Sequence, residues 1–283
     1  MVVGKIAKQG AELRDEVTAT ETPAGSAAFW WLGQHTFILK AGGKIFYLDP
    51  WFAAWESRQV APLLTAEQAD NCDFALITHG HGDHLCPDTL RGLAIASPNA
   101  HFFCPKTEAA RLKEEANIPE ARMMPMTAGD VWEQDGVRIT AIKSKHEFFD
   151  EHPTLGFPYL GYVIEMETEA GGVRFYHSGD TINYEGLLTA LQKFPRLDAI
   201  FVPINGRDAE RFTSGCIGNF TYQEAAELAG ELNVGLVVPS HYDMFVGNQE
   251  DSSKFGRFLQ AKYPNVPHWI GDYGKLVRFG PKA

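Results

Sequence analysis

A cluster of histidine and aspartate residues at positions 79–84 constrains this chain more than any other feature. It begins at His79, ends at His84 and has the pattern His-x-His-x-Asp-His, directly after a short apolar run at 73–78 that predicts a buried strand. Burying so many polar groups at the end of a strand is costly unless something replaces their lost hydration. A divalent cation does so, because imidazole nitrogens and carboxylate oxygens are ligands that such ions prefer. A polar loop rich in histidine by chance is the alternative, and the density of the pattern argues against it.

The spacing within the cluster predicts two neighbouring sets of ligands. Side chains two positions apart in an extended chain, as His79 and His81 are, can point the same way. The glycines between the polar residues permit a turn and remove side chains that would obstruct a metal ion or a substrate. After that turn, Asp83 and His84 can face a second position.

Composition and charge exclude several classes of partner. The chain has 283 residues and 45% of them are hydrophobic, which is enough for a substantial core. The net charge of −11 argues against adhesion to long nucleic acid or to an anionic membrane, and no apolar stretch is long enough to span a bilayer. The four cysteines form no Cys-x-x-Cys pair and the N-terminus has no apolar leader, so we expect a reducing, cytoplasmic location.

Periodicity and turn residues predict a layered α/β fold. Residues 1–28 are polar and mixed, which predicts a loosely attached N-terminal arm, and residues 29–283 are predicted to form one domain because no repeat or linker divides them. Early hairpin-connected strands followed by strand–helix alternation predict mixed layering. The expected strands are 29–32, 36–40, 44–49, 73–78, 101–104, 130–132, 137–142, 160–166, 173–177, 197–202, 235–239 and part of 269–279, and the expected helices are 66–71, 87–96, 107–117, 184–193, 221–233 and 251–262.

Three further candidate ligands, His146, Asp180 and His241, each lie a few residues past the end of a predicted strand. Strand ends are where a rigid scaffold meets open loops, and binding residues concentrate there. His146 taken alone could be a surface histidine among charged neighbours, but its order and spacing after His84 favour ligation.

Taken in chain order, the motifs His-x-His-x-Asp-His, His146, Ser-Gly-Asp180 and Ser-His241 resemble the metallo-β-lactamase superfamily. The resemblance runs from about Phe29 to the C-terminus. It implies a four-layer αββα sandwich with a two-metal site along one edge.

Within that superfamily, four segments are similar to the branch that contains L-ascorbate-6-phosphate lactonase: Trp30-Trp-Leu-Gly, Leu48-Asp-Pro, Tyr176-His-Ser-Gly-Asp and residues 221–243. That branch holds hydrolases with different substrates. The present chain also looks shorter than that lactonase, with trimmed loops, and loops set the choice of substrate.

The superfamily resemblance implies seven ligands for two divalent ions: His79, His81 and His146 for the first, Asp83, His84 and His241 for the second, and Asp180 bridging both. It also implies that Asp49 orients a ligand imidazole through a hydrogen bond. Asp83 and Asp180 are the candidate catalytic carboxylates, and Asp83 could also accept or relay a proton. No cysteine occupies a ligand position, which fits zinc, manganese or iron.

This site predicts a hydrolase, because two cations about 3.5–4 Å apart can activate a shared water and stabilise oxyanion charge. We expect a lactonase or ester hydrolase that acts on a small anionic, sugar-like molecule. A phosphodiesterase that acts on nucleotide or RNA is one alternative, and a non-catalytic metal-binding sensor is another. The sequence leaves the substrate, the native metal and any homo-oligomer open.

Four residues close to predicted strand ends are candidate substrate contacts: His35, Asn205, Arg207 and Tyr242. The planar guanidinium of Arg207 suits a phosphate or carboxylate, although an ion pair with Asp208 or Glu210 is an equal alternative. We expect His177 to lie in the core or to support a ligand. Other residues are expected mainly to pack or to face solvent, with the last three also candidate walls of the pocket: His101, His152, His268, Trp51, Phe52 and Phe220.

Overall fold

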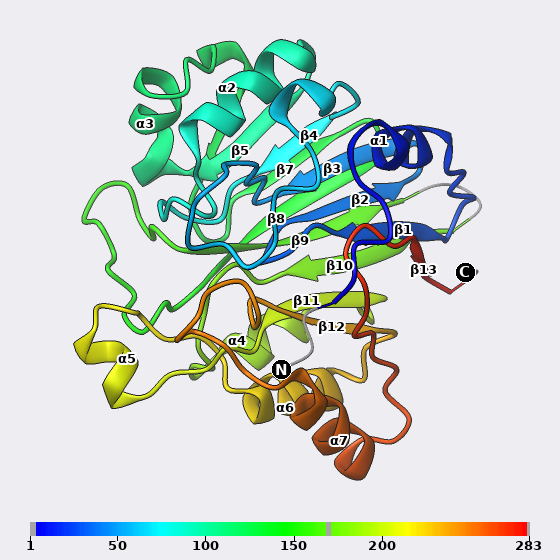
Figure 1. The fold of residues 1–283 in the computed structure, drawn as a ribbon, viewed down its shortest axis with the longest axis vertical. Coiled ribbons are helices and arrows are strands. Elements are labelled where there is room, and N and C mark those ends of the chain that lie inside the picture. The colour runs from blue at the N-terminus through cyan, green and yellow to red at the C-terminus, as the bar shows by residue number, and fades with distance from the viewer. Residues whose placement is uncertain (1–3, 168–170, 282–283) are drawn as a thin grey trace.

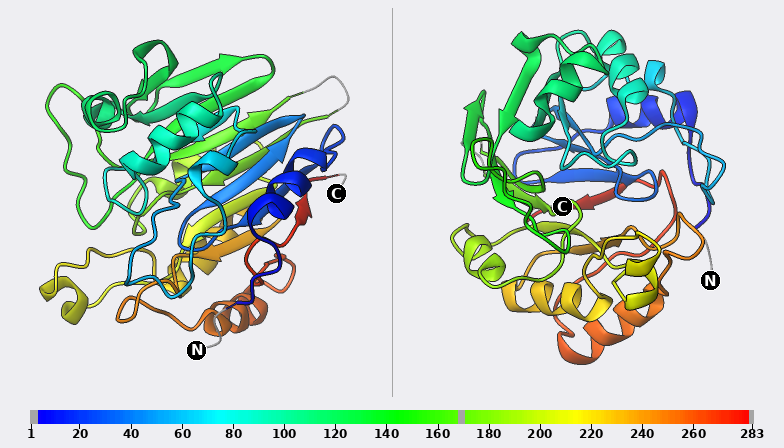
Figure 2. Two further views of the ribbon diagram at one scale, coloured as in Figure 1. Left: turned by 45° about the horizontal axis from the view of Figure 1, so that its top comes forward. Right: turned by 90° about the vertical axis from the view of Figure 1, so that its left-hand side faces the viewer.

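Two mixed β-sheets face each other between two layers of helices in this computed structural model, which describes residues 4–167 and 171–281 (Figure 1). The right-hand view of Figure 2 shows the four layers edge on. This arrangement confirms the predicted αββα sandwich. The helices on the side of the first sheet are α1 (Gly10–Ala19), α2 (Pro87–Ala96) and α3 (Ala109–Glu114), and those on the side of the second are α4 (Leu187–Leu191), α6 (Tyr222–Leu232) and α7 (Ser252–Lys262).

The first sheet has the strand order β13-β1-β2-β3-β4-β5-β6. Strands β1 to β3 form an antiparallel meander, whereas β3 to β6 are parallel, so the connections between them carry α2 and α3. The strands are β1 (Ala27–Trp31), β2 (Phe37–Ala41), β3 (Lys44–Leu48), β4 (Phe74–Leu76), β5 (His101–Pro105), β6 (Met123–Met126) and β13 (Val277–Phe279).

The second sheet has the strand order β12-β11-β10-β9-β8-β7. Strands β7 to β10 are antiparallel neighbours, and β10 to β12 are parallel, with α4 and α6 in their crossovers. The strands are β7 (Val131–Gln134), β8 (Val137–Lys143), β9 (Leu160–Met166), β10 (Val173–His177), β11 (Ala199–Pro203) and β12 (Val237–Ser240).

The central strands are largely apolar because both of their faces are covered. Every residue of β9 is buried, as is every residue of β1 and β2. Strands that are buried on both sides lose the alternation of polar and apolar residues. Aromatic rings join the two sheets across the core, with Phe201 of β11 lying 4.8 Å from Phe37 and 5.2 Å from Phe29 between ring centroids.

The topology brings the ends of several strands to one edge of the sandwich. Strands β3 and β4 are parallel, so their carboxyl ends lie side by side. Strands β8 and β10 both run antiparallel to β9, and β12 runs in the same direction as β10 through β11. The loops after these strands therefore meet at the edge from which α5 (Ala209–Thr213) projects in Figure 1.

Residues 4–28 do not form the loosely attached arm that their composition predicts. Leu13 and Val17 of α1 are fully buried against the core, and Trp30 Nε1 donates a 2.9 Å hydrogen bond to Glu16 Oε1. The ammonium of Lys40 donates to the carbonyl oxygens of residues 17 and 18. The prediction was wrong because two apolar residues four positions apart are enough to anchor a short helix that is otherwise polar.

Several element boundaries also differ from the predictions. The helix expected at 107–117 is a 3₁₀ turn (Lys106–Glu108) followed by α3, and the backbone then turns at Asn117, where φ is +55°. The helix expected at 184–193 shortens to α4, and α5 and β6 are additional elements. Pro125 within β6 obscured that strand, since proline argues against a strand interior. Within residues 4–167 and 171–281, no helix is both long and apolar enough to cross a bilayer.

Leu13→Ala should lower the free energy of unfolding by about 2–4 kcal/mol, because it removes a fully buried side chain. Urea unfolding followed by tryptophan fluorescence measures this loss. Glu12→Ala, at an exposed position of the same helix, is the control and should change stability by less than about 0.5 kcal/mol. An equally silent Leu13→Ala would show that α1 does not contribute to the folded core.

Candidate metal centre

The histidine-rich loop lies between the end of β4 and the start of α2, and close contacts require its glycines. A Cβ atom on Gly80 would lie 2.6 Å from Glu108 Oε2, and one on Gly82 would lie 2.9 Å from Trp55 Cη2. The loop closes through hydrogen bonds of 3.0 and 2.7 Å from two consecutive backbone amides, of His84 and the residue after it, to the carbonyl oxygen of His81. These contacts hold the loop compactly over the strand end.

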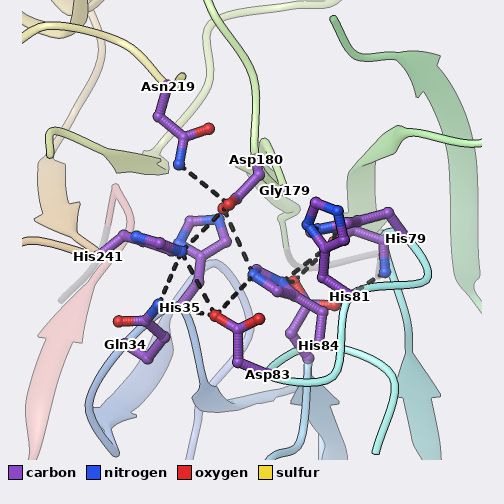
Figure 3. A network of polar contacts seen from close by, with 12 residues as sticks. Gln34, His35, His79, His81, Asp83, His84, Gly179, Asp180, Asn219 and His241 are labelled. Carbon is purple, nitrogen blue, oxygen red and sulfur yellow. Dashed lines mark hydrogen bonds and ion pairs between the residues drawn. The ribbon is translucent and has the colours of Figure 1, made fainter. Parts of the chain in front are cut away.

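The structure brings the seven predicted ligands together from four separate segments of the chain (Figure 3). One side-chain atom from each residue lies within 4.8 Å of the others in each of three groups: His79, His81 and His146; Asp83, His84 and His241; and His79, His84 and Asp180. Two of these groups are the two ligand sets that the sequence predicts, and the third joins Asp180 to members of both.

Asp180 lies between the two ligand sets. Its Oδ2 is 3.1 Å from His241 Nε2 and 3.7 Å from His146 Nε2, and its Oδ1 is 3.5 Å from His84 Nε2. Asn219 Nδ2 donates a 3.0 Å hydrogen bond to Oδ2 from the opposite side, as Figure 3 shows. Asp180 is therefore in contact with a member of each set.

Asp49 lies behind the ligands and is fully buried. Its Oδ2 accepts hydrogen bonds from His84 Nδ1 and His177 Nε2, each 2.9 Å long, and from Thr78 Oγ1 at 2.8 Å. Thr78 Oγ1 in turn lies 3.0 Å from His79 Nδ1. Asp49 thus fixes one nitrogen of His84 directly and one of His79 through Thr78, which leaves the Nε2 atoms of both rings for the site.

The imidazole set and the carboxylate set have opposite electrostatic character. Burial and the neighbouring imidazoles lower the pKa of His79, and burial lowers the pKa of His146 to about 4, so both rings are neutral at pH 7. Burial also disfavours the charged form of His84, but the surrounding carboxylates, Asp180 first, outweigh it and raise its pKa to about 9. Burial would raise the pKa of Asp180, but His241 and His84 hold it well below its usual value.

The residues of this site fit divalent cations. Within the described residues, His84 Nε2 and Asp180 Oδ1 are buried atoms without a hydrogen-bond partner, although they lie only 3.5 Å apart. Such orphaned buried atoms are costly unless an ion or a water satisfies them. The carboxylates also attract positive charge strongly enough to raise the pKa of His84. Nitrogen and oxygen donors without a thiolate suit zinc, manganese or iron.

Two further contacts hold ligands that come from distant loops. His146 Nδ1 donates a 2.9 Å hydrogen bond to the carbonyl oxygen of Gly218. The backbone amide of His241 donates to the carbonyl oxygen of Gln34, and Gln34 Nε2 lies 2.8 Å from both Asp83 Oδ2 and His241 Nε2. Gln34 and His241 both have left-handed backbone, with φ of +52° and +61°. Non-glycine residues in that region are uncommon and often mark functional sites.

A cavity of about 290 Å³ opens onto this centre. Five of the predicted ligands line it, together with six other residues: Gln34, Gly215, Cys216, Ile217, Phe245 and Asn248. None of these six residues carries a charged side chain: Gln34 and Asn248 are polar amides, Gly215 and Cys216 are small, and Ile217 and Phe245 are apolar.

The four predicted substrate contacts are not among the residues that line this cavity. The guanidinium of Arg207 makes a bidentate ion pair with Glu224, at 2.7 Å on both nitrogens, rather than with Asp208 or Glu210. His35 is fully buried, with Nδ1 2.6 Å from Ser240 Oγ.

Asn205 and Tyr242 are also held by protein contacts. Asn205 is buried and hydrogen-bonds to Asn248 and Asn219. Tyr242 is buried with its ring centroid 5.3 Å from that of Trp31. Both residues therefore support the loops of the site from behind.

Sequence reasoning missed the residues that support the ligands from other loops. Asn219, the carbonyl of Gly218 and Gln34 contact ligands, although no pattern in the sequence assigned them to the site. Gln34 directly precedes the candidate His35, between two strands, and this position is the one feature of the sequence that could have placed it near the site. His177, which was expected to be in the core or to support a ligand, is fully buried and donates to Asp49.

Comparisons with known proteins agree with this fold and site. A family profile described as "Beta-lactamase superfamily domain" matches residues 45–242. A UPF0173 metal-dependent hydrolase of Sulfurisphaera tokodaii is 30% identical over 62% of this chain and 71% of its own, and one of Myxococcus xanthus is 29% identical over 86% of this chain and 81% of its own. The metallo-β-lactamase fold protein YhfI of Bacillus subtilis superposes with a TM-score of 0.61 at 12% identity, over 89% of this chain and 99% of that protein.

Two mixed sheets flanked by helices define a metallo-β-lactamase fold, and buried histidine and aspartate groups lie at one edge of it. Within the beta-lactamase superfamily, the chain belongs to the UPF0173 family of metal-dependent hydrolases. The names of these relatives state no substrate.

Asp49→Asn should weaken zinc binding by about 10-fold to 100-fold, because it disturbs the hydrogen bonds that orient His84 and His79. Competition with a chromophoric chelator measures the affinity. Asp70→Asn carries the same substitution at an exposed carboxylate that pairs with Arg14, and it should bind zinc as the wild type does. Equal affinities for the two variants would contradict the role of Asp49.

Proposed function

We propose that this hydrolase holds two divalent ions and opens a lactone or a similar ester bond. The observation that carries the proposal is the position of Asp180, whose two oxygens face His84 on one side and His146 and His241 on the other. One carboxylate in contact with both ligand sets suits a bridging ligand. A structural ion would not need a second set.

In this proposal the ions would be held by the residues that the resemblance implies: His79, His81 and His146 for the first, Asp83, His84 and His241 for the second, and Asp180 for both. Zinc, manganese and iron all fit the donor atoms. When bound, the ions would supply Lewis acidity that favours ionisation of a water molecule and offsets negative charge on the reacting oxygen.

The two proposed catalytic carboxylates act from fixed positions. Burial opposes ionisation of Asp83, but His84 and His241 keep its pKa below the usual value, so it is ionised in the resting enzyme. Gln34 Nε2 holds Asp83 Oδ2 at 2.8 Å, and the other oxygen, Oδ1, is the candidate acceptor for a proton from a water in the cavity. Asp180 is held in place by Asn219.

The character of the cavity favours a carbonyl centre over a phosphodiester. Among the described residues that line it, none is lysine or arginine. Phosphoryl-transfer sites commonly use such side chains beside their metal ions to clamp the transferring group. The resemblance to the lactonase branch supports a lactone in particular. Membership of a family of metal-dependent hydrolases favours catalysis over a sensor role.

The deciding experiment is a turnover assay of the metal-loaded protein on a panel of lactones and simple esters beside bis-(p-nitrophenyl) phosphate. The proposal predicts hydrolysis of at least one lactone or ester with a kcat/KM well above that of the diester. Efficient turnover of the diester, with no turnover of any lactone or ester, would contradict the proposal and favour the phosphodiesterase.

Asp180→Ala should lose metal and activity together, with activity falling at least about 100-fold, since even residues that only support ligands cost 10-fold to 100-fold. Emission spectrometry of the purified variant measures the metal content. His101→Ala is the control, because His101 packs beside Phe74 and Trp132 on β5, and it should keep its metal. A full metal complement in Asp180→Ala would contradict the bridging role.

A further inference from the structure

We propose that the non-reacting part of the substrate is neutral and apolar, and that it lies against an aromatic wall formed by Trp51, Trp55 and Phe245. This inference rests on the proposed hydrolysis of an ester or lactone and specifies its substrate class. It replaces the anionic, sugar-like substrate that the sequence predicts.

The aromatic wall stands directly beside the metal-binding loop. The indole edge of Trp55 lies so close to Gly82, the residue before Asp83, that a Cβ there would be 2.9 Å from it. The Trp55 ring centroid is 4.9 Å from that of Trp51 and 6.4 Å from that of Phe245. Phe245 also lines the cavity. An apolar group attached to a carbonyl at the metal centre would therefore reach the rings of Trp55 and Phe245, with Trp51 packed behind them.

The wall is a fixed part of the protein because two loops are joined behind it. Arg58 pairs with Phe245 in an isolated β-bridge, and the next backbone amide, of Gln59, donates to the carbonyl oxygen of Met244. The Arg58 guanidinium stacks 3.8 Å over the ring of Trp51 and donates to the carbonyl oxygens of residues 51, 53 and 60. Trp51 is thereby buried at the base, while 43% of the Trp55 surface stays exposed.

Further apolar residues occur in the chain segments that line the cavity. Ile217 lines the cavity on the loop that follows α5. Val246, next to Phe245, is 76% exposed, and Phe212 of α5 is 51% exposed. Both exposed residues are within three positions of a residue that lines the cavity, Phe245 for Val246 and Gly215 for Phe212. Exposed apolar surface beside a site suits an apolar ligand.

Two arginines on the segment between β11 and α6 are already paired. Arg207 is held by Glu224 and by the carbonyl oxygen of Asn219. Arg211 is paired with Asp208 and with backbone carbonyl oxygens. None of the described lining residues is a lysine or an arginine, so a phosphate or carboxylate on the substrate would find no cationic side chain in the cavity. Outside the metal centre, no cationic side chain would therefore offset the free-energy cost of desolvating such an anionic group.

A series of neutral γ-lactones with lengthening alkyl chains, from γ-butyrolactone to γ-decalactone, tests the proposal on the metal-loaded protein. We expect kcat/KM to rise by about threefold for each added methylene that reaches the wall. The anionic 6-phosphogluconolactone is the comparison substrate and should be turned over more slowly than the long neutral lactones. A flat or falling series, or faster turnover of the phosphorylated lactone, would overturn the proposal.

Variants of Trp55 test the wall itself. Trp55→Ser should reduce the gain per methylene, and Trp55→Leu, which keeps an apolar side chain, should restore most of it. Ile95→Ser is the matched control, because Ile95 is 77% exposed near the end of α2 and does not line the cavity. An unchanged gain in Trp55→Ser would contradict the wall. Sedimentation of the wild type and of Trp55→Ser tests one further possibility. If the wild type is a dimer and Trp55→Ser is a monomer, a second copy of the chain covers these residues, and the proposed substrate wall is contradicted.

Protection of Cys216 separates this proposal from the proposed function. Cys216 lines the cavity and is half-buried, whereas the other cysteines are buried, so alkylation with N-ethylmaleimide should select it. Octanohydroxamate should protect Cys216 at a lower concentration than acetohydroxamate. If no lactone or ester is hydrolysed but octanohydroxamate still protects at the lower concentration, the proposed ester hydrolysis is wrong and the proposed apolar substrate class is supported. If the two hydroxamates protect equally, the apolar class fails whatever the enzyme hydrolyses.

Discussion

The rest of the site depends on the buried carboxylate of Asp49. One of its oxygens accepts hydrogen bonds from His84, His177 and Thr78, which come from the ends of two different sheets. Burial alone would raise the pKa of Asp49, but His84 and His177 hold it well below its usual value, so the carboxylate is ionised. A buried charge that is fully hydrogen-bonded ties the sheets together and sets the direction of the ligand imidazoles.

This anchor explains why the site can combine two kinds of ligand set. The imidazole of His146 is neutral, so its nitrogen lone pair can bind a metal ion. The carboxylates around His84 raise its pKa, which shows that this part of the site stabilises positive charge. Buried carboxylates without a counter-charge would destabilise the fold. Divalent cations would satisfy both sets, since they would accept the lone pairs of one and neutralise the other. They would also supply the Lewis acidity that hydrolysis needs.

The fold class and the convergence of the seven candidate ligands could be predicted from the sequence, because each candidate follows a largely apolar strand and the strands are continuous buried runs. The walls of the cavity could not, since they come from loops whose partners are set by tertiary contacts. Arg207 illustrates this limit: its neighbours Asp208 and Glu210 suggested an ion pair, but the structure pairs it with Glu224, 17 positions away. The packing of α1 likewise depends on contacts that no local pattern of polar residues reveals.

Anomalous diffraction from crystals of the metal-loaded protein tests the central claim most directly. The account predicts two metal peaks per chain, one among His79, His81 and His146 and the other among Asp83, His84 and His241, with the carboxylate of Asp180 between them. A single peak, or peaks that are not in contact with Asp180, would contradict a dinuclear centre.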